Sequence, residues 1–315
     1  MNSCTTLILA AGQGTRMKSS EIKVLHVVYG ASILEHLIHT LQKVVRGSIG
    51  CVIGHQAERV HSILDSVVGK ISTIFQEQQL GTGHAVMCSR KFLLEQGTRV
   101  LVVPGDCPLV SVGTLERLLA REEEEEVCLV AARLEEPGGY GRVLLDEKGK
   151  PQRIVEYKDA DTVTRGLNLV NSSIYLFDLP FLLGSLEQLT TENIQREYYL
   201  TDVIALAAAR GTAGLFLLED EREMLGVNTR DDLTRVAACL HDRIIDEHLS
   251  AGVTILDPKT THIEIEVKIG QDSVIYPGCY LYRGARIGRN CILGPNSVID
   301  GEVSNDSLVN WRGQR

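Results

Sequence analysis

The sequence has few aromatic residues and no excess of basic ones. Its 315 residues are 44% apolar, 23% charged and only 5% aromatic, so leucine, isoleucine and valine must fill the core. The formal net charge is −9, and the chain would remain acidic without its longest acidic block, Glu122 to Glu126. We therefore expect no nucleic acid partner, and a few local cations must meet any polyanionic substrate.

Long hydrophobic runs are also missing. The first residues have no basic lead and no stretch long enough for a signal peptide, and no run approaches the roughly 20 apolar residues of a membrane span. The eight cysteines are scattered, and no two have the Cys-x-x-Cys spacing of a metal knuckle. These absences predict a cytoplasmic protein with reduced core cysteines and no membrane partner.

Short apolar runs alternate with helical patterns through residues 5–228. The strand-like runs are 5–9, 49–52, 100–103, 127–131, 173–177 and 214–218, and the clearest amphipathic stretches are 33–45 and 112–120. This alternation predicts an α/β fold whose mostly parallel sheet is covered on both faces. Ligands of such sheets bind at the carboxyl ends of the strands, so the loops after Leu9, Val103 and Leu218 are the expected site.

The hydrophobic period changes near residue 250. Residues 229–250 read as one linker helix, and beyond it aliphatic residues recur every six positions at Ile263, Ile269, Ile275, Leu281, Ile287, Leu293 and Ile299. A period of six fits neither a helix nor an ordinary hairpin, but it fits a β-solenoid with three short faces per coil. At roughly 18 residues per coil the chain holds a little over two coils. A β-meander is the alternative.

The first candidate site is the loop after the first strand, where residues 9–17 read Leu-Ala-Ala-Gly-Gln-Gly-Thr-Arg-Met. Its glycines let backbone N–H groups approach an anion, and Arg16 adds positive charge. Met17 replaces the third glycine of a dinucleotide fingerprint, and no Gly-Lys-Ser/Thr follows as in a P-loop. Because Lys23 lies on the same connection, the loop predicts a triphosphate clamp, with a plain glycine turn as the alternative.

Two further polar segments are candidates. Residues 76–85 read Gln-Glu-Gln-Gln-Leu-Gly-Thr-Gly-His-Ala, whose amides and hydroxyl suit a base or a phosphate, unless they only cap a helix that begins at His84. In residues 100–109 a strand leads Asp106 into a turn between two prolines. Many such aspartates form only an Asx-turn. At the end of a buried strand, however, a carboxylate can hold Mg²⁺ together with substrate phosphates.

Four later motifs complete a resemblance to the sugar nucleotidyltransferases. They are Pro-Gly-Gly-Tyr-Gly-Arg at 137–142, Ile-Val-Glu-Tyr-Lys-Asp at 154–159, Glu-Tyr-Tyr-Leu-Thr-Asp at 197–202 and Gly-Val-Asn at 226–228. Along essentially its whole length, the chain most resembles the bacterial bifunctional N-acetylglucosamine-1-phosphate uridyltransferase/glucosamine-1-phosphate acetyltransferases. The Gly-Tyr-Gly-Arg and Glu-Tyr-Tyr-x-Thr-Asp motifs distinguish this family from the glucose-1-phosphate enzymes.

The resemblance implies a division of the chain. A Rossmann-like nucleotidyltransferase domain is expected at residues 1–228, a linker helix at 229–250 and a short left-handed parallel β-helix of hexapeptide repeats at 251–315. The family's acetyltransferase site is built from segments further along the β-helix that this sequence does not contain. Acetyl transfer is therefore expected to be absent, with the β-helix truncated.

The resemblance also implies residue roles. Arg16 and Lys23 are expected to be the catalytic cations, and Asp106 with Asn228 is expected to coordinate Mg²⁺. The residues expected to contact the nucleotide are Leu9, Ala10, Ala11, Gly12, Gly14, Thr15, Gln76, Gly81, Thr82, Gly105 and Asp106. Those expected to contact the amino sugar are Gly141, Glu156, Asn171, Tyr199, Thr201 and Asn228.

Two positions depart from the family pattern. The chain has Asn171-Ser172-Ser173 where the family has Asn-Thr-Gly, and a serine side chain there is expected to crowd the sugar pocket. Pro104 stands where a more flexible or aromatic residue is common, which stiffens the aspartate loop.

The expected reaction is uridylyl transfer from UTP to N-acetylglucosamine-1-phosphate, giving UDP-N-acetylglucosamine for cell-wall precursors and pyrophosphate. The sugar phosphate brings its own charged oxygen nucleophile, which agrees with the lack of a recognisable catalytic triad. One alternative is a related enzyme with another sugar or base. The other is a non-catalytic paralogue that binds a sugar nucleotide, although such a protein need not keep both metal ligands.

The β-helix implies a homotrimer, because it is the trimer-forming element of the family. Candidates for outward-facing interface residues are Val274, Tyr276, Tyr280, Tyr282 and Val298. Two coils offer a limited contact area, so the trimer is expected to be weak.

Overall fold

The structure, a computed structural model, describes residues 4–12, 14–54, 57–66, 69, 71–121 and 125–310. The acidic block at 122–126 therefore lies partly outside the described residues. The chain forms two compact units, one of residues 1–25 and 34–229 and the other of residues 26–33 and 230–315. Residues 26–33 thus belong to the second unit, although the predicted division placed them in the first domain. The boundaries at 228 and 250 remain predictions.

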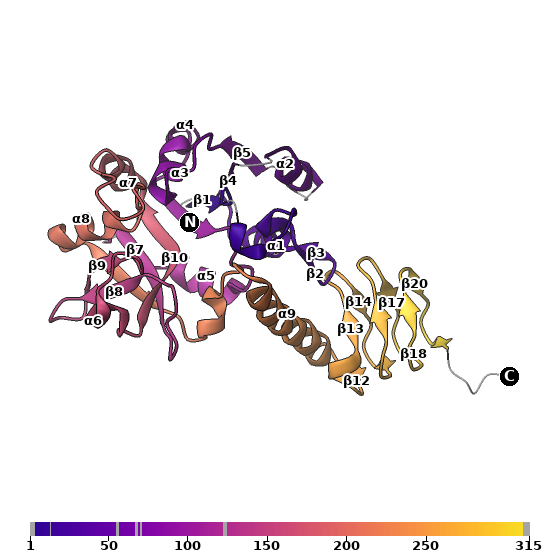
Figure 1. The fold of residues 1–315 in the computed structure, drawn as a ribbon. Coiled ribbons are helices and arrows are strands. Elements are labelled where there is room, and N and C mark those ends of the chain that lie inside the picture. The colour runs from indigo at the N-terminus through magenta and orange to yellow at the C-terminus, as the bar shows by residue number, and fades with distance from the viewer. Residues whose placement is uncertain are drawn as a thin grey trace. The chain divides into compact units, whose positions relative to one another are not determined.

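A nine-stranded mixed sheet forms the centre of the first unit (Figure 1). Its strand order is β11-β7-β10-β6-β1-β4-β5, and the hairpin of β8 and β9 attaches to β10. The strands are β1 (Cys4–Leu9), β4 (Ile49–Ile53), β5 (Ile71–Phe75), β6 (Arg99–Pro104), β7 (Val127–Arg133), β8 (Arg142–Leu145), β9 (Pro151–Val155), β10 (Leu169–Asp178) and β11 (Ala213–Leu217). Along the main path only β10 runs antiparallel to its neighbours, so the predicted mostly parallel sheet is confirmed.

Helices cover both faces of this sheet, because successive strand side chains point to opposite sides. Leu7 and Val102 enter a core with α3, α4, α7 and α8, whereas Ile8 and Val103 enter a core with α1, α2 and α5. The helices are α1 (Ile33–Val44), α2 (Ala57–Ser66), α3 (Thr82–Cys88), α4 (Arg90–Leu94), α5 (Val112–Leu119), α6 (Thr162–Arg165), α7 (Leu179–Leu186) and α8 (Asp202–Arg210), with short 3-10 turns η1 (Thr15–Met17), η2 (Lys23–Leu25) and η3 (Glu221–Met224). Within the described ranges, no helix is both long and apolar enough to cross a membrane.

The second unit contains the helix α9 (Arg230–Ser250), the small strand pair β2 (Val27–Val28) and β3 (Ala31–Ser32), the 3-10 turn η4 (Pro258–Thr260) and a β-solenoid (Figure 1). Three parallel sheets form the solenoid. They are β12 (Thr254–Ile255), β15 (Val274–Ile275), β18 (Ile292–Leu293) and β21 (Leu308–Val309); β13 (His262–Ile263), β16 (Tyr280–Leu281) and β19 (Val298–Ile299); and β14 (Lys268–Ile269), β17 (Arg286–Ile287) and β20 (Glu302–Val303).

The aliphatic residues of the six-residue period form the solenoid core. Ile263, Ile275, Leu281 and Leu293 are completely buried there, together with the small residues Cys279 and Cys291. The predicted short left-handed parallel β-helix is therefore confirmed, and the linker helix expected at 229–250 is α9. The predicted length of a little over two coils was wrong: the described residues form three full coils and the first strand of a fourth, because the first coil begins at β12, before the run of aliphatic residues that starts at Ile263.

Candidate active site

The carboxyl ends of the neighbouring strands β1 and β6 open into a cavity of about 670 Å³ inside the first unit. The backbone N–H of Gly105 donates to the Leu9 carbonyl at 2.9 Å, and a Cβ on Gly105 would lie 2.9 Å from that of Ala10. Only glycine permits this close approach of the two loops. The predicted site residues that line the cavity are Leu9, Ala10, Ala11, Gly12, Arg16, Lys23, Gln76, Gly81, Thr82, Asp106, Glu156, Thr201 and Asn228.

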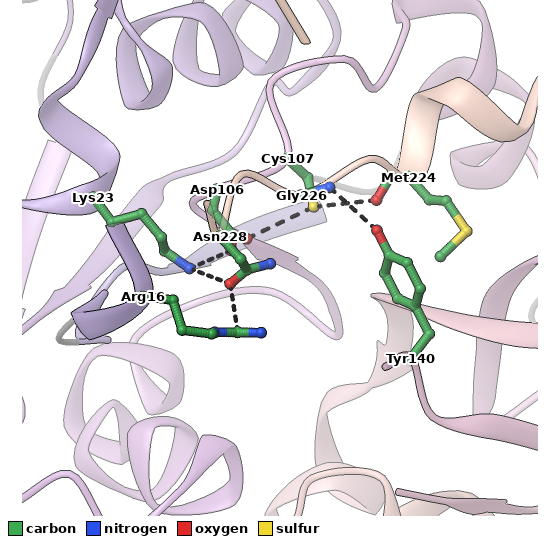
Figure 2. A network of polar contacts seen from close by, with 8 residues as sticks. All are labelled: Arg16, Lys23, Asp106, Cys107, Tyr140, Met224, Gly226 and Asn228. Carbon is green, nitrogen blue, oxygen red and sulfur yellow. Dashed lines mark hydrogen bonds and ion pairs between the residues drawn. The ribbon is translucent and has the colours of Figure 1, made fainter. Parts of the chain in front are cut away.

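At one end of the cavity, four charged or amide side chains converge (Figure 2). The Lys23 ammonium donates to Asp106 Oδ2 at 2.5 Å and to Asn228 Oδ1 at 3.1 Å. The Arg16 guanidinium donates to the same Asn228 oxygen at 2.8 Å. Gly14 lets Lys23 come close, because Gly14 has φ 63° and a Cβ there would lie 2.6 Å from the Lys23 Cβ.

The two oxygens expected to bind magnesium fit that role. Because one ammonium contacts both Asp106 Oδ2 and Asn228 Oδ1, these oxygens converge on a single cation position. A carboxylate and an amide oxygen are hard ligands, and Mg²⁺ needs only one or two protein ligands when phosphates and water supply the rest. No cluster of three or more histidine, cysteine, aspartate or glutamate side chains suited to a metal occurs among the described residues.

The nucleotide segment of residues 76–85 has a defined shape. The buried Gln76 side chain donates to the Gly81 carbonyl at 3.2 Å and lies 3.0 Å from His84 Nδ1. The Thr82 hydroxyl accepts from the Leu200 N–H at 3.1 Å, which joins the start of α3 to the 197–202 motif. The helix begins at Thr82 rather than at His84, and Gly81 is its N-cap without a side-chain capping bond, so the alternative of a polar capping loop was wrong. Gln76, Gly81 and Thr82 instead line the cavity, and their contact with a nucleotide stays a prediction.

Glu156 and Thr201 mark the end of the cavity expected to receive the sugar. Glu156 follows β9, and its Oε1 accepts from the Thr201 hydroxyl at 3.1 Å. Burial raises the pKa of Glu156, and the nearby charge of Asp159 adds to this rise, while the hydrogen bond from Thr201 opposes it. Burial also raises the pKa of Asp202. The carboxylate of Glu156 therefore lies where a hydrogen bond from a sugar hydroxyl would replace the bonds to water that it loses on burial.

Six predicted residues lie behind or beside the cavity lining: Gly14, Thr15, Gly105, Gly141, Asn171 and Tyr199. The buried side-chain amide of Asn171 donates to the Tyr175 hydroxyl at 2.7 Å, and the backbone N–H of Asn171 donates to the Gly141 carbonyl at 3.0 Å. The Tyr199 hydroxyl donates to Asp159 Oδ2 at 3.0 Å, and burial raises the pKa of Tyr199 to about 12. Direct substrate contacts by these six residues, and by the thirteen that line the cavity, remain predictions.

The sequence did not identify seven residues of the lining as contacts: Val24, Gln79, Ala85, Pro104, Tyr175, Glu197 and Leu200. It did place Ser173 at the pocket. Gln79, Pro104 and Glu197 lie within motifs that had been singled out, so a wider reading of those motifs could have found them. Ser173 enters the cavity from a bulge in β10, where it has φ 64°. Tyr175 lies outside the motifs described above, so nothing in the sequence pointed to it as a cavity residue.

Two known families match separate parts of the chain. Residues 6–154 match the MobA-like NTP transferase domain, and residues 266–301 match the bacterial transferase hexapeptide (six repeats). These matches cover the cavity loops after β1 and β6 and most of the β-solenoid.

Longer relatives match nearly the whole chain. The "Bifunctional protein GlmU" of Thermoanaerobacter pseudethanolicus is 39% identical over 315 residues, which is 99% of this chain and 68% of that protein. The protein of the same name from Trichlorobacter lovleyi is 41% identical over 92% of this chain and 64% of its own length. That from Thermotoga maritima is 41% identical over 96% and 66%. The chain spans about two thirds of the length of these relatives.

A solved structure from Bacillus anthracis, described as a glucose-1-phosphate thymidylyltransferase in complex with a sucrose, has the same fold. It superposes with a TM-score of 0.62 over 75% of this chain and 94% of that one, at 18% identity.

Proposed function

The chain belongs to the family of bifunctional GlmU proteins, and on that basis we propose that it transfers a uridylyl group from UTP to N-acetylglucosamine-1-phosphate. The products are UDP-N-acetylglucosamine and pyrophosphate. The single observation that carries the proposal is the convergence of Arg16, Lys23, Asp106 and Asn228 at one end of the cavity. A cleft that only held a neutral ligand would have no need of this charge arrangement.

The reaction needs no protein nucleophile. A phosphate oxygen of the sugar phosphate attacks the α-phosphorus of UTP, and the bond from that phosphorus to the bridging oxygen of pyrophosphate breaks. Because the attacking oxygen is already charged, no general base has to remove a proton. Catalysis then depends on positioning the two phosphates in line and on neutralising their charge.

The chain's own residues have distinct tasks in this scheme. Arg16 and Lys23 neutralise the triphosphate, and Lys23 stabilises the negative charge that shifts around the transferring phosphoryl group. The loop of Leu9 to Gly12, with Gln76, Gly81 and Thr82, receives the nucleotide. Asp106 and Asn228 would hold Mg²⁺, which supplies charge neutralisation for the phosphates when bound.

Glu156, Thr201 and the residues behind them receive the amino sugar. An ionised Glu156 accepts hydrogen bonds from sugar hydroxyls, and Asn171 and Gly141 support the same wall. Ser173, one of the two departures from the family pattern, lines the same cavity.

A substrate panel tests the proposal and its alternatives. Pyrophosphate release is measured with the four common NTPs, each against several sugar-1-phosphates and with the magnesium concentration fixed. Highest kcat/KM for UTP with N-acetylglucosamine-1-phosphate supports the proposal. A preference for another pair identifies a related sugar nucleotidyltransferase, and binding of UDP-N-acetylglucosamine without turnover identifies a non-catalytic paralogue.

The absence of acetyl transfer by this 315-residue chain remains a prediction. Following free CoA in the presence of acetyl-CoA and glucosamine-1-phosphate tests it, and steady release that depends on the sugar phosphate contradicts it.

A further inference from the structure

The two proposed magnesium ligands lie on loops that are far apart in the sequence. Asp106 follows β6, and Asn228 follows the 3-10 turn η3. Their oxygens converge only if the loop of residues 105–111 and the segment 220–228 keep a fixed relative position. The contacts between these two segments therefore decide the geometry of the proposed metal site.

Three contacts join the segments. The Val227 N–H donates to the Asp106 carbonyl at 2.9 Å. The Cys107 thiol lies 3.7 Å from the Met224 carbonyl, a contact that Figure 2 draws. The third contact is the strongest. The Glu223 carboxylate accepts from both the N–H and the hydroxyl of Ser111, at 2.9 and 3.0 Å.

Glu223 has no evident role except this contact. The residue is 7% exposed, and no ion pair joins it to a basic side chain among the described residues. Burying a carboxylate is costly unless hydrogen bonds replace its hydration. Both carboxylate oxygens of Glu223 accept hydrogen bonds from Ser111. Ser111 is in turn held in place as the N-cap of α5, where its hydroxyl accepts from the Thr114 N–H at 3.1 Å.

We propose that Glu223 is a positioning residue for the magnesium site. Its two hydrogen bonds to Ser111 anchor the segment that carries Asn228 to the start of α5, and so to the loop that carries Asp106. Glu223 touches neither substrate nor metal. Charge-assisted bonds of this kind hold a geometry more firmly than neutral ones, and partners that orient metal ligands typically contribute about 10- to 100-fold in metal affinity.

The test measures how much magnesium tightens UTP binding. UTP is titrated calorimetrically into the full chain without sugar phosphate, once with saturating MgCl₂ and once with EDTA, and the ratio of the two dissociation constants is compared among variants. Glu223→Ala removes the contact, and Glu223→Gln keeps both hydrogen bonds, since an amide can accept from the N–H and donate to the hydroxyl. Glu221→Ala removes an exposed carboxylate from the same turn and is the control.

We expect Glu223→Ala to lower this ratio by about tenfold or more while UTP binding in EDTA is unchanged. Glu223→Gln and Glu221→Ala should keep the ratio of the original protein. A Glu223→Ala protein that loses thermal stability but keeps the ratio overturns the proposal, and so does a Glu223→Gln protein as impaired as the alanine variant. The proposal rests on the proposed function. If the original protein binds UTP equally with and without magnesium, the metal assignment itself is wrong.

Discussion

The Lys23 ammonium lies against both oxygens proposed to bind magnesium, with side-chain exposure of only 13%. We expect Lys23→Ala to depress kcat more than it raises the KM for UTP, because a fixed cation stabilises the charge redistributed in the transition state preferentially. A loss of roughly 100-fold in kcat is the usual scale for one such group. Steady-state pyrophosphate release measures both constants.

Lys18→Ala is the matched control for this variant, because Lys18 is an exposed lysine of the same connection. It should leave both constants unchanged. A pure KM effect of Lys23→Ala would place Lys23 in ground-state binding and contradict its proposed role.

Replacing the buried carboxylate of Glu156 should affect stability and activity in opposite directions. Its pKa is raised in the folded protein, so its stabilising contribution is complete below the unfolded pKa and is lost as pH rises through the folded one. Glu156→Gln should therefore raise the unfolding temperature at pH 7 and lose this advantage near pH 4. It should also lower kcat/KM for the sugar phosphate by about tenfold or more, the scale of one hydrogen bond to a charged group.

Thermal unfolding at the two pH values and kinetics at pH 7 check this pair of effects. A Glu156→Gln protein that is less stable at pH 7 than the original would show that the Thr201 hydrogen bond outweighs the burial of the charge. Unchanged sugar kinetics would remove Glu156 from the site.

At the scale of elements, the bulge in β10 shapes the sugar end of the cavity. The pairing of β10 with β7 shifts register between Asn171 and Tyr175, and Ser173 takes φ 64° there. A left-handed conformation costs a non-glycine residue roughly 1–2 kcal/mol, and Ser173→Gly removes this strain. Glycine, however, loses more chain entropy on folding, which offsets part of the gain in stability. We therefore expect Ser173→Gly to change stability little.

The same substitution should act on the sugar. Removing the side chain widens the cavity, so the KM for N-acetylglucosamine-1-phosphate should fall roughly several-fold while the KM for UTP stays constant. An unchanged or higher KM for the sugar phosphate would show that Ser173 does not crowd the pocket.

Elements with strong periodicity could be predicted from the sequence, and weakly apolar ones could not. The buried strands β1, β4, β6 and β7 and the solenoid coils repeat a clear hydrophobic pattern. By contrast, β5 is only partly buried, and β8 and β9 form a hairpin with mixed polarity. Their stability comes from pairing with neighbours that lie far away in the sequence, which periodicity does not report.

The residues of the candidate site likewise divide into those that could be predicted from the sequence and those that could not. Arg16, Lys23 and Asp106 could be proposed because they follow strands whose ends meet in a parallel sheet. Glu223 and Ser111 could not, because the role proposed for them arises only when two distant segments pack together. The antiparallel direction of β10, which brings Ser173 and Tyr175 to the cavity, likewise leaves no local trace.

At the scale of the whole molecule, the solenoid predicts self-association. Outward positions of the β13-β16-β19 face are His262, Tyr280 and Val298 in register, and Tyr280, Tyr282 and Val298 are 41%, 41% and 62% exposed. The β14-β17-β20 face instead presents Lys268, Arg286 and Glu302, which suit solvent. Exposed aromatic ladders of this kind are typical of interfaces.

We expect a concentration-dependent trimer that dissociates in the low micromolar range or above, because three coils offer a limited contact area and a stable interface buries roughly 1,000 Å² or more. Light scattering coupled to size exclusion measures it. Tyr280→Glu should favour the monomer, whereas Lys268→Glu, on the charged face, should not. A strict monomer at high concentration, or a dimer at all concentrations, contradicts the expectation.

The most direct test of the proposed activity is the stoichiometry of its products. UTP and N-acetylglucosamine-1-phosphate are incubated with the protein and magnesium, and UDP-N-acetylglucosamine and pyrophosphate are quantified by mass spectrometry and enzymatic assay. We expect equal amounts of both products, none in EDTA, and a loss of at least ~100-fold in rate for a folded Asp106→Asn protein. Pyrophosphate without the sugar nucleotide, or an Asp106→Asn protein within a few-fold of the original rate, would contradict this expectation.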